Sequence, residues 1–311
     1  MSEKQTSTIE WLYGLEDYFD FAKNTEAADY IRNIITIFYA DNPNAALKKL
    51  CVSAFDLADS SEKFAKIINL YFTTLDKNFS LLELASNARV LFPKEKIFNA
   101  IHMYSRYNSN VEVLNDALSR SQIKSKIWLI EELAKIDTNH DYVAVFAGWF
   151  GQIKGLYDKR LTYAKMRVIE MDKIACESSD YVFNLSNLEN YKVKSVQADI
   201  NNLTLHKNGY EWTVENFRDN TSYSEKFSPN LVINTSAEHM SEEWFFQIKF
   251  KELESNPIIA IQSNNLFDIP EHVNCVHSVD HMKKKYPMKE ILYEGELQLK
   301  GYKRVMLIGR A

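Results

Sequence analysis

Glycine and proline are scarce in the first part of this 311-residue chain. Residues 1–140 hold a single glycine, Gly14, and two prolines, Pro43 and Pro93, whereas the other seven glycines and four prolines come later. Few such residues favour long helices, and frequent ones favour short, alternating elements. The sequence therefore predicts a helical domain over residues 1–136 and a second domain of different architecture over residues 137–311.

Cysteine is also scarce, and long apolar runs are missing. The three cysteines lie far apart and form no CxxC pair, so no disulfide framework is expected from Cys51, Cys176 and Cys275. No stretch approaches the roughly eighteen apolar residues that a membrane-spanning helix requires, and the first residues contain no apolar signal core. We therefore expect a cytoplasmic protein without a membrane partner.

An excess of positive charge is missing as well. The 42 aspartates and glutamates outnumber the 37 lysines and arginines, which gives a formal net charge of −5. This balance provides no general attraction to nucleic acid or to anionic lipid. Small-molecule or protein partners are therefore expected in preference to nucleic acid.

Apolar residues recur at helical spacing in the first region. One helical face, with the spacing i, i+3, i+4, i+7, i+11, is formed by Phe64, Ile67, Ile68, Tyr71 and Leu75. Ser80 precedes another apolar segment and is a suitable N-cap residue. Together these signals predict six to eight helices over residues 8–136.

Short apolar runs that end in polar or glycine residues fill the second region. Most of these runs lack strict alternation of apolar and polar residues, as expected of parallel strands buried on both faces. Helical stretches separate most of the runs. The third run is the weakest, because Lys194, Ser195 and Gln197 interrupt it. The predicted strands are Val143–Ala147, Arg167–Met171, Val193–Ala198, Leu231–Ile233 and Ile258–Ile261. They predict an α/β fold with a mostly parallel sheet.

Two further segments predict antiparallel hairpins. Ile291–Leu297 and Tyr302–Ile308 flank Gly301, which is a turn signal. Between the third and fourth strands, apolar and polar residues alternate on both sides of Asn208-Gly209, a dipeptide that supports a type I′ turn. We therefore expect a closing hairpin at the C-terminal end and a second hairpin where a crossover helix would be usual.

The residues that follow each predicted strand are the candidates for a site, because open α/β sheets bind ligands beyond the carboxyl ends of their parallel strands. After the first run, Ala147, Gly148 and Gly151 can form a turn whose backbone approaches a ligand. A plain tight turn is the alternative for the same residues.

Acids follow the second and third runs. Glu170 and Asp172 stand roughly 20 residues beyond the glycine turn, where an acid can bind ribose hydroxyls. Asp199, after the third run, can accept a hydrogen bond from an adenine amino group. Capping of the following helix is the alternative role for each acid.

Polar residues directly follow the fourth and fifth runs, in Asn234–His239 and Gln262–Asn265. Such clusters at the ends of buried strands favour contact with a substrate, although helix capping by Ser236 explains part of the first segment. Within it, Glu238 or His239 can accept a proton from a substrate nucleophile. A structural, hydrogen-bonded histidine is the alternative.

Four of the seven histidines fall between His239 and His281. Together with a cysteine and an acid, several residues of this segment could supply metal ligands: Cys275, His277, Asp280 and His281. Their spacing matches no strong zinc pattern. The sequence therefore predicts no metal site.

A glycine turn, acids and polar loops follow one another along the chain, in the segments VAVFAGWFG, VIEMD, VQAD and NLVINTS. The predicted C-terminal hairpin follows them in YEGELQLKGYKRVMLIGR. This order resembles the class I S-adenosylmethionine (SAM)-dependent methyltransferases. The resemblance covers residues 141–311 and extends to uncharacterised methyltransferase-like proteins of phages and bacteria. The family usually carries GxG in its first motif, whereas Phe150 stands two residues after Gly148 here.

The resemblance implies an α/β fold in which a helical N-terminal domain precedes a Rossmann-like methyltransferase domain with a mostly parallel sheet and a C-terminal antiparallel hairpin. It implies SAM as the cofactor and methyl transfer to an unidentified small-molecule or protein acceptor. The implied cofactor-binding residues are Ala147, Gly148, Gly151, Glu170, Asp172, Asp199 and Asn234. The implied catalytic residues are Glu238, His239 and Asn234.

Two other functions fit the same residues. A helical domain followed by a SAM-binding domain also resembles nicotianamine synthase-like enzymes, which transfer the aminobutyrate part of SAM. A degenerate SAM fold that serves as a non-catalytic interaction module is the third alternative, and Phe150 in the glycine turn favours it.

Overall fold

The computed structural model describes residues 3–58, 60–75, 79–107, 112–149, 151–184, 192–206, 209–216, 221–247 and 250–311. These residues form two compact units, Met1–Ile127 and Trp128–Ala311. No helix in this described part of the chain is long and apolar enough to cross a membrane.

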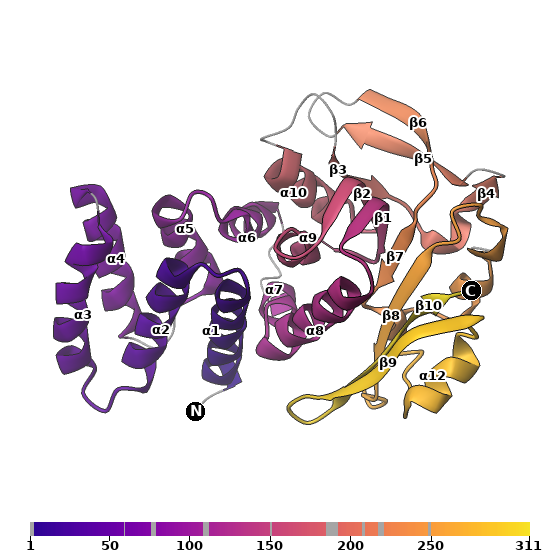
Figure 1. Cartoon of the computed structure of the whole chain (residues 1–311). Helices are drawn as coiled ribbons and strands as arrows, with labels where there is room; N and C mark the ends of the chain where they lie inside the picture. Colours follow the sequence, from indigo (N-terminus) through magenta and orange to yellow (C-terminus); the bar gives the residue numbers. More distant parts are fainter. Residues whose placement is uncertain are drawn as a thin grey trace. The chain divides into compact units, whose positions relative to one another are not determined.

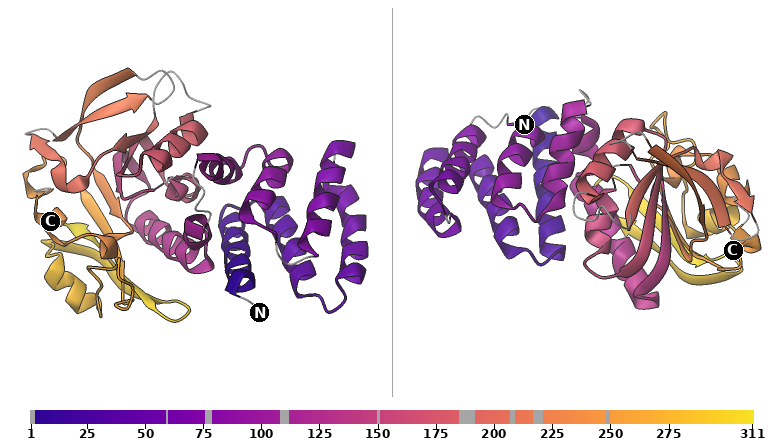
Figure 2. Two further views of the ribbon diagram at one scale, coloured as in Figure 1. Left: turned by 180° about the vertical axis from the view of Figure 1, so that it is seen from behind. Right: turned by 90° about the horizontal axis from the view of Figure 1, so that it is seen from above.

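The first unit is built of helices (Figures 1 and 2). The described helices are α1 (Glu3–Phe21), α2 (Thr25–Tyr39), α3 (Pro43–Leu57), α4 (Ser61–Thr74), α5 (Leu81–Leu91), α6 (Lys96–Tyr107), α7 (Glu112–Ala117) and α8 (Arg120–Ile136). The last of them continues into the second unit. The helical character predicted for this region is confirmed.

Capping side chains explain where several of these helices begin. Asn24, Asn42 and Ser60 each accept a hydrogen bond from a backbone N–H three residues ahead, at the start of α2, α3 and α4. Ser80 and Glu83 form a reciprocal capping box at the start of α5. Each cap satisfies a backbone donor that the helix itself cannot pair.

The second unit contains a sheet of seven described strands in the order β3-β2-β1-β7-β8-β10-β9. The parallel strands are β1 (Asn139–Phe146), β2 (Thr162–Glu170), β3 (Val193–Gln197), β7 (Leu231–Asn234) and β8 (Ile258–Asn264). β10 (Lys303–Arg310) runs antiparallel to both β8 and β9 (Glu290–Gln298). The predicted mostly parallel sheet with a C-terminal antiparallel hairpin is therefore confirmed.

The strand order changes direction beside β1. From β1 the chain passes outward to β2 and β3, and it then returns to place β7 on the other side of β1. Phe146, the last residue of β1, pairs with Ile169 of β2 and with Asn234 of β7. Open α/β sheets bind ligands at the carboxyl ends of the strands at such a switch point.

Helices connect the strands of this sheet (Figure 1). They are α9 (Gln152–Tyr157), α10 (Lys173–Asn184), α11 (Glu243–Gln247) and α12 (Val279–Lys285), together with the 3-10 turns η1 (Ile200–Asn202), η2 (Ala237–His239) and η3 (Phe250–Glu252). The turn η2 directly follows β7, so it stands at the carboxyl edge of the sheet.

A separate antiparallel sheet occupies the connection between β3 and β7. It consists of β4 (Thr204–His206), β5 (Gly209–Asn216) and β6 (Thr221–Phe227). β4 and β5 form the predicted hairpin, with Leu205 paired to Tyr210, while Asn208 of the predicted turn lies outside the described residues. β6 was not predicted, because most of its side chains are polar and exposed.

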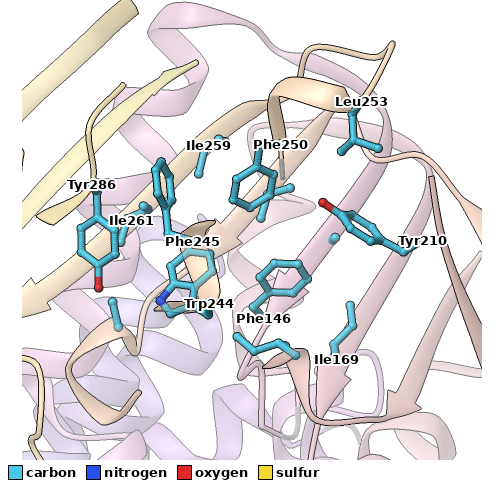
Figure 3. Close-up of a cluster of buried hydrophobic side chains, with 14 of the residues drawn as sticks. Phe146, Ile169, Tyr210, Trp244, Phe245, Phe250, Leu253, Ile259, Ile261 and Tyr286 are labelled. Atoms are coloured by element: carbon cyan, nitrogen blue, oxygen red, sulfur yellow. The ribbon is translucent and has the colours of Figure 1, made fainter. Parts of the chain in front are cut away.

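Aromatic side chains form one core with both sheets (Figure 3). Trp244 of α11 is fully buried and lies edge-on to Phe146 of β1, with ring centroids 6.1 Å apart. Tyr286 packs on the same indole, and Tyr210 of β5 belongs to the same cluster. Large buried aromatic groups contribute strongly to core stability. This core fixes the carboxyl end of β1 against the segment that follows η2.

Candidate functional site

A backbone loop with unusual dihedral angles follows β1. The angle φ is 48° at Ala147, 49° at Trp149 and 70° at Gly151, and residues with a side chain rarely adopt such values. Gly148 lies so close to β2 that a Cβ atom there would stand 2.5 Å from Cγ1 of Val168. Left-handed non-glycine residues cost about 1–3 kcal/mol each, and strain of this kind clusters at ligand sites.

Glu170, the last residue of β2, ties this loop to the neighbouring strand. Its Oε2 accepts a hydrogen bond from the backbone N–H of Trp149 (2.9 Å). Its Oε1 accepts hydrogen bonds from the backbone N–H groups of Met171 (2.8 Å) and Asp172 (3.1 Å). An ionised carboxylate can accept about four hydrogen bonds, about two at each oxygen. These three contacts therefore leave about one acceptor position, on Oε2. Glu170 therefore organises the loop and can still accept one further donor.

The other two acids predicted to bind a cofactor cap helical turns. Asp172 Oδ1 accepts hydrogen bonds from the N–H groups of Ile174 (2.8 Å) and Ala175 (3.3 Å) at the start of α10. Asp199 Oδ1 accepts one from the N–H of Asn201 (2.9 Å) at the start of η1. The capping alternative thus describes both acids in this structure, and a cofactor-binding role for them stays a prediction.

β7 ends in a fully buried asparagine. Asn234 Oδ1 accepts a hydrogen bond from the N–H of Ser236 (3.0 Å), and its Nδ2 lies 3.2 Å from Sδ of Met240. A side-chain contact to a backbone N–H two residues on is typical of a tight turn. This turn leads the chain into η2, which carries Glu238 and His239. Asn234 therefore shapes the segment that positions the two other residues predicted to be catalytic.

Glu238 is only 1% exposed and belongs to a polar network. Its Oε1 lies 3.1 Å from Nη2 of Arg304 on β10 and accepts a 2.8 Å hydrogen bond from Nδ2 of Asn264 at the end of β8. Arg304 also donates to the carbonyl oxygen of Thr235 (2.9 Å), and the N–H of Asn274 donates to the carbonyl oxygen of Glu238 (3.0 Å). The network joins the carboxyl ends of β7 and β8 to β10.

Two histidines lie beside Glu238. His239 is exposed, and the ring of His272 approaches it edge-on, with ring centroids 4.6 Å apart. Nitrogen atoms of both rings and a carboxylate oxygen of Glu238 all lie within 4.8 Å of one another. Burial lowers the pKa of His272 below 6.5, although the charge of Glu238 opposes this shift. The ring of His272 is therefore neutral at neutral pH.

The polar residues that follow β8 hold the backbone in place. Ser263 Oγ donates to the carbonyl oxygen of Asn274 (3.1 Å), and Asn264 Oδ1 accepts a hydrogen bond from the N–H of Leu266 (2.9 Å). Asn265 Oδ1 accepts one from the N–H of Lys303 (2.8 Å). The contacts seen for Gln262–Asn265 are thus with the protein itself.

The four residues weighed in the sequence as metal ligands make other contacts. Cys275 Sγ lies 3.3 Å from the carbonyl oxygen of Leu266, and burial raises the pKa of this thiol. The ring of His277 stacks on Phe267, with ring centroids 4.2 Å apart. The backbone N–H of His277 donates a hydrogen bond to Nδ1 of His281 (3.2 Å). Within the described ranges of the chain, the group of metal-ligating side chains that converges is Glu238, His239 and His272 instead.

Arg304 and His272 are the site residues that the sequence did not reveal. Arg304 precedes the apolar run Val305–Ile308, and a charged residue beside such a run signals a buried partner of opposite charge. His272 lies in the connection between β8 and α12, where no pattern marks it. Phe150, which departs from the glycine motif of the resemblance, lies outside the described residues.

No protein-family model matches the sequence, and no curated protein is significantly similar to it. Solved structures with a similar chain trace include the N-methyltransferase NodS from Bradyrhizobium japonicum WM9 in complex with S-adenosyl-L-homocysteine (SAH). Its TM-score is 0.45 at 8% identity, over 68% of this chain and 98% of that chain. A second is the magnesium protoporphyrin IX methyltransferase from Synechocystis PCC 6803 with bound SAM, with a TM-score of 0.42 at 12% identity over 73% of this chain and 97% of that chain. Because these TM-scores and identities are low, the similarity does not decide what this chain does.

Proposed function

We propose that the chain is a SAM-dependent methyltransferase that binds SAM at the carboxyl ends of β1 and β2. One observation carries the proposal: the strained loop after β1 stands at the switch point of the sheet and is tied by Glu170 to the end of β2. The order of the sequence motifs supports the same cofactor. The acceptor is a small molecule or a protein in preference to nucleic acid, given the acidic balance of the chain.

The geometry of the loop suits the cofactor. The lack of a side chain at Gly148 allows the loop to lie directly on Val168, and the backbone at Ala147 and Gly151 can approach a ligand closely. The remaining acceptor position of Glu170 suits a ribose hydroxyl, because charged acceptors form strong hydrogen bonds. We assign cofactor binding to the predicted residues Ala147, Gly148, Gly151, Glu170, Asp172, Asp199 and Asn234.

SAM supplies a methyl group that its sulfonium centre activates for transfer. The part of the protein in such a reaction is mainly alignment of the acceptor, which lowers the barrier by fixing its position. A proton acceptor is needed when the attacking atom carries a proton of high pKa. In the metal-free protein we assign this role to His239 before Glu238, because His239 is exposed whereas Glu238 is buried against Arg304. Asn234 holds the turn that presents both residues.

Transfer of aminobutyrate and a non-catalytic role are the competing functions. Incubation of the protein with SAM and candidate acceptors separates them, since methyl transfer releases SAH and aminobutyrate transfer releases methylthioadenosine. If the folded protein bound neither SAM nor SAH, the result would favour a non-catalytic interaction module. The domain division at residues 136 and 137 and a cytoplasmic location stay predictions.

Replacing Glu170 with alanine tests the cofactor site. Loss of the carboxylate removes the tie to the loop and the proposed ribose contact, so SAM affinity is expected to fall by about 1.5–3 kcal/mol, or roughly 10- to 150-fold. Isothermal titration calorimetry with SAM and SAH measures the change. Glu177→Ala is the matched control, because Glu177 lies on α10, away from the loop, and forms a surface ion pair with Lys173 at 3.8 Å. Unchanged affinity in a folded Glu170→Ala protein would contradict the assignment.

A further inference from the structure

Glu238, His239 and His272 bring a carboxylate and two imidazoles to one place from two separate segments. Glu238 and His239 belong to η2, after β7, and His272 belongs to the connection between β8 and α12. One potential ligand atom from each residue lies within 4.8 Å of the other two. This spacing is close enough for one ion to contact all three after small side-chain rotations.

The hydrogen bond of His272 determines which of its nitrogens is available. Nδ1 lies 3.2 Å from the carbonyl oxygen of Leu266. A carbonyl oxygen only accepts hydrogen bonds, so Nδ1 must carry the proton, and the lone pair is left on Nε2. Histidines that bind metals are oriented in the same way, with the second ring N–H donated to a backbone carbonyl or a carboxylate. His272 is therefore held in the tautomer that a metal ligand requires.

Glu238 offers one oxygen whose bonding is incomplete. Oε1 already contacts Arg304 and Asn264, whereas Oε2 is buried and has no hydrogen-bond partner among the residues that the structure describes. A buried carboxylate oxygen without a partner is costly and needs an explanation. A cation bound at Oε2 would supply the missing interaction. The contacts at Oε1 would then orient the ligand, as hydrogen bonds to metal-binding carboxylates generally do.

We propose that Glu238, His239 and His272 form a binding site for a divalent first-row transition ion such as zinc. Two imidazoles and one carboxylate suit Zn²⁺ or Fe²⁺, whereas Mg²⁺ and Ca²⁺ prefer ligand sets made of oxygen. Three protein ligands leave at least one coordination position open, and the exposure of His239 leaves that side of the ion accessible. The sequence spacing predicted no metal site, because the three ligands are not arranged in a recognisable local motif.

Arg304 limits how tightly the ion is held. Its guanidinium neutralises part of the charge of Glu238 and repels a second cation nearby. The site is therefore expected to bind zinc more weakly than a closed structural site with four ligands. An ion that is bound in this open manner resembles catalytic sites, where a substrate atom or water completes the coordination. In the ion-bound protein the lone pair of His239 is occupied, so a hydroxide on the ion would take over its role as proton acceptor.

Zinc binding by the full-length, tag-free chain tests the proposal without SAM, so its outcome does not depend on the proposed methyl transfer. After treatment with a chelator, competition against a chromophoric chelator is expected to show one Zn²⁺ per chain, unaffected by excess Mg²⁺. Cobalt at the same site is expected to show visible absorption that added zinc removes. His239→Ala and His272→Ala are each expected to weaken zinc binding by at least tenfold.

His277→Ala is the matched control, because His277 lies in the same connection as His272, is exposed and stands outside the group of three. This variant is expected to bind zinc like the parent protein. Circular dichroism of the metal-free proteins checks their folding, and the exposed position of His239 makes His239→Ala the safer variant. Zinc binding that survives both His239→Ala and His272→Ala, or the absence of a stoichiometric site in the parent protein, would overturn the proposal.

Discussion

At the scale of single residues, the contact between Glu238 and Arg304 is a buried ion pair, and each side chain is 2% exposed. Removing two charges from water costs several kcal/mol each, and their attraction offsets this cost only if the remaining polar atoms are also paired. Asn264 and the carbonyl oxygen of Thr235 provide some of these partners, whereas Oε2 of Glu238 has none among the described residues. Removal of one member alone therefore leaves a buried charge without its counter-charge and destabilises the site.

Replacing Arg304 with methionine is expected to destabilise the protein by about 3–5 kcal/mol, because Glu238 is left as a buried charge without its partner. The double variant Arg304→Met/Glu238→Gln is expected to regain part of that stability, since it removes the charge. Urea unfolding followed by circular dichroism gives both free energies. If the double variant is no more stable than the single one, the ion pair is not the cause of the loss.

The sequence predicted part of the candidate site at this scale. Glu238 and His239 were proposed because they directly follow a buried strand, a position that depends only on local pattern. The roles that Asp172 and Asp199 have as caps were an open alternative, since a carboxylate next to a helix start fits either role. Arg304 and His272 reach the site from later segments, so only the three-dimensional structure shows these contacts.

At the scale of elements, one ion pair fastens β6 to β2. The buried guanidinium of Arg167 donates to both oxygens of Glu225, at 2.6 and 2.7 Å, and Trp212 Nε1 donates to Oε2 of Glu225 at 3.2 Å. Burial alone would raise the pKa of Glu225, but the hydrogen bonds from Arg167 outweigh it, so the pKa lies below 4.5. The smaller sheet is thus attached to the larger one by a charged contact as well as by its aromatic face.

Glu225→Ala is expected to destabilise the protein by about 3–5 kcal/mol at neutral pH, because Arg167 stays buried without its partner. The pKa of Glu225 is depressed in the folded state, so its contribution is present above pH 4.5 and is lost as the pH falls through the lower folded value. The difference between parent and variant should therefore shrink on acidification below pH 4.5. Unfolding free energies measured from neutral to acidic pH check both expectations.

Glu215→Ala is the matched control for this experiment, because Glu215 is an exposed acid on the neighbouring strand β5. A change of no more than about 0.5 kcal/mol is expected for such a surface residue. A similar loss of stability in both variants would show that the effect does not come from the contact with Arg167.

Strands with apolar side chains could be predicted from the sequence, whereas strands whose polar side chains are held by distant partners could not. The continuous apolar runs of β1, β7 and β8 sufficed to predict buried parallel strands. β3 was the weakest prediction because Lys194, Ser195 and Gln197 interrupt its apolar run. Lys194 is buried in the structure through its contact with Asp180 of α10. β6 lacks an apolar pattern altogether, and the partner that holds it, Arg167, lies 58 residues earlier in the chain.

At the scale of the whole molecule, the proposed site residues all belong to the unit Trp128–Ala311. Saturating SAH is expected to slow hydrogen exchange at residues 147–149 and 170–172, because ligand binding suppresses the opening of its own site. Exchange in α1 to α6 is expected to stay unchanged. Mass spectrometry of the full chain with and without SAH measures both regions. Protection confined to the helices of the first unit would contradict the placement of the cofactor.

The Glu238 network also bears on the order in which the site is made during synthesis. The side-chain hydrogen bonds of Glu170 span at most 21 residues, whereas those of the network span 26 residues from Asn264 and 69 from Arg304 to Thr235. Short loops close at a smaller entropic cost than long ones, and a contact cannot form before both residues have left the ribosome. The loop after β1 can therefore be in place while β10 is still untranslated. A nascent chain at that stage holds the loop that Glu170 ties to β2, while Glu238 still lacks the arginine that balances its charge.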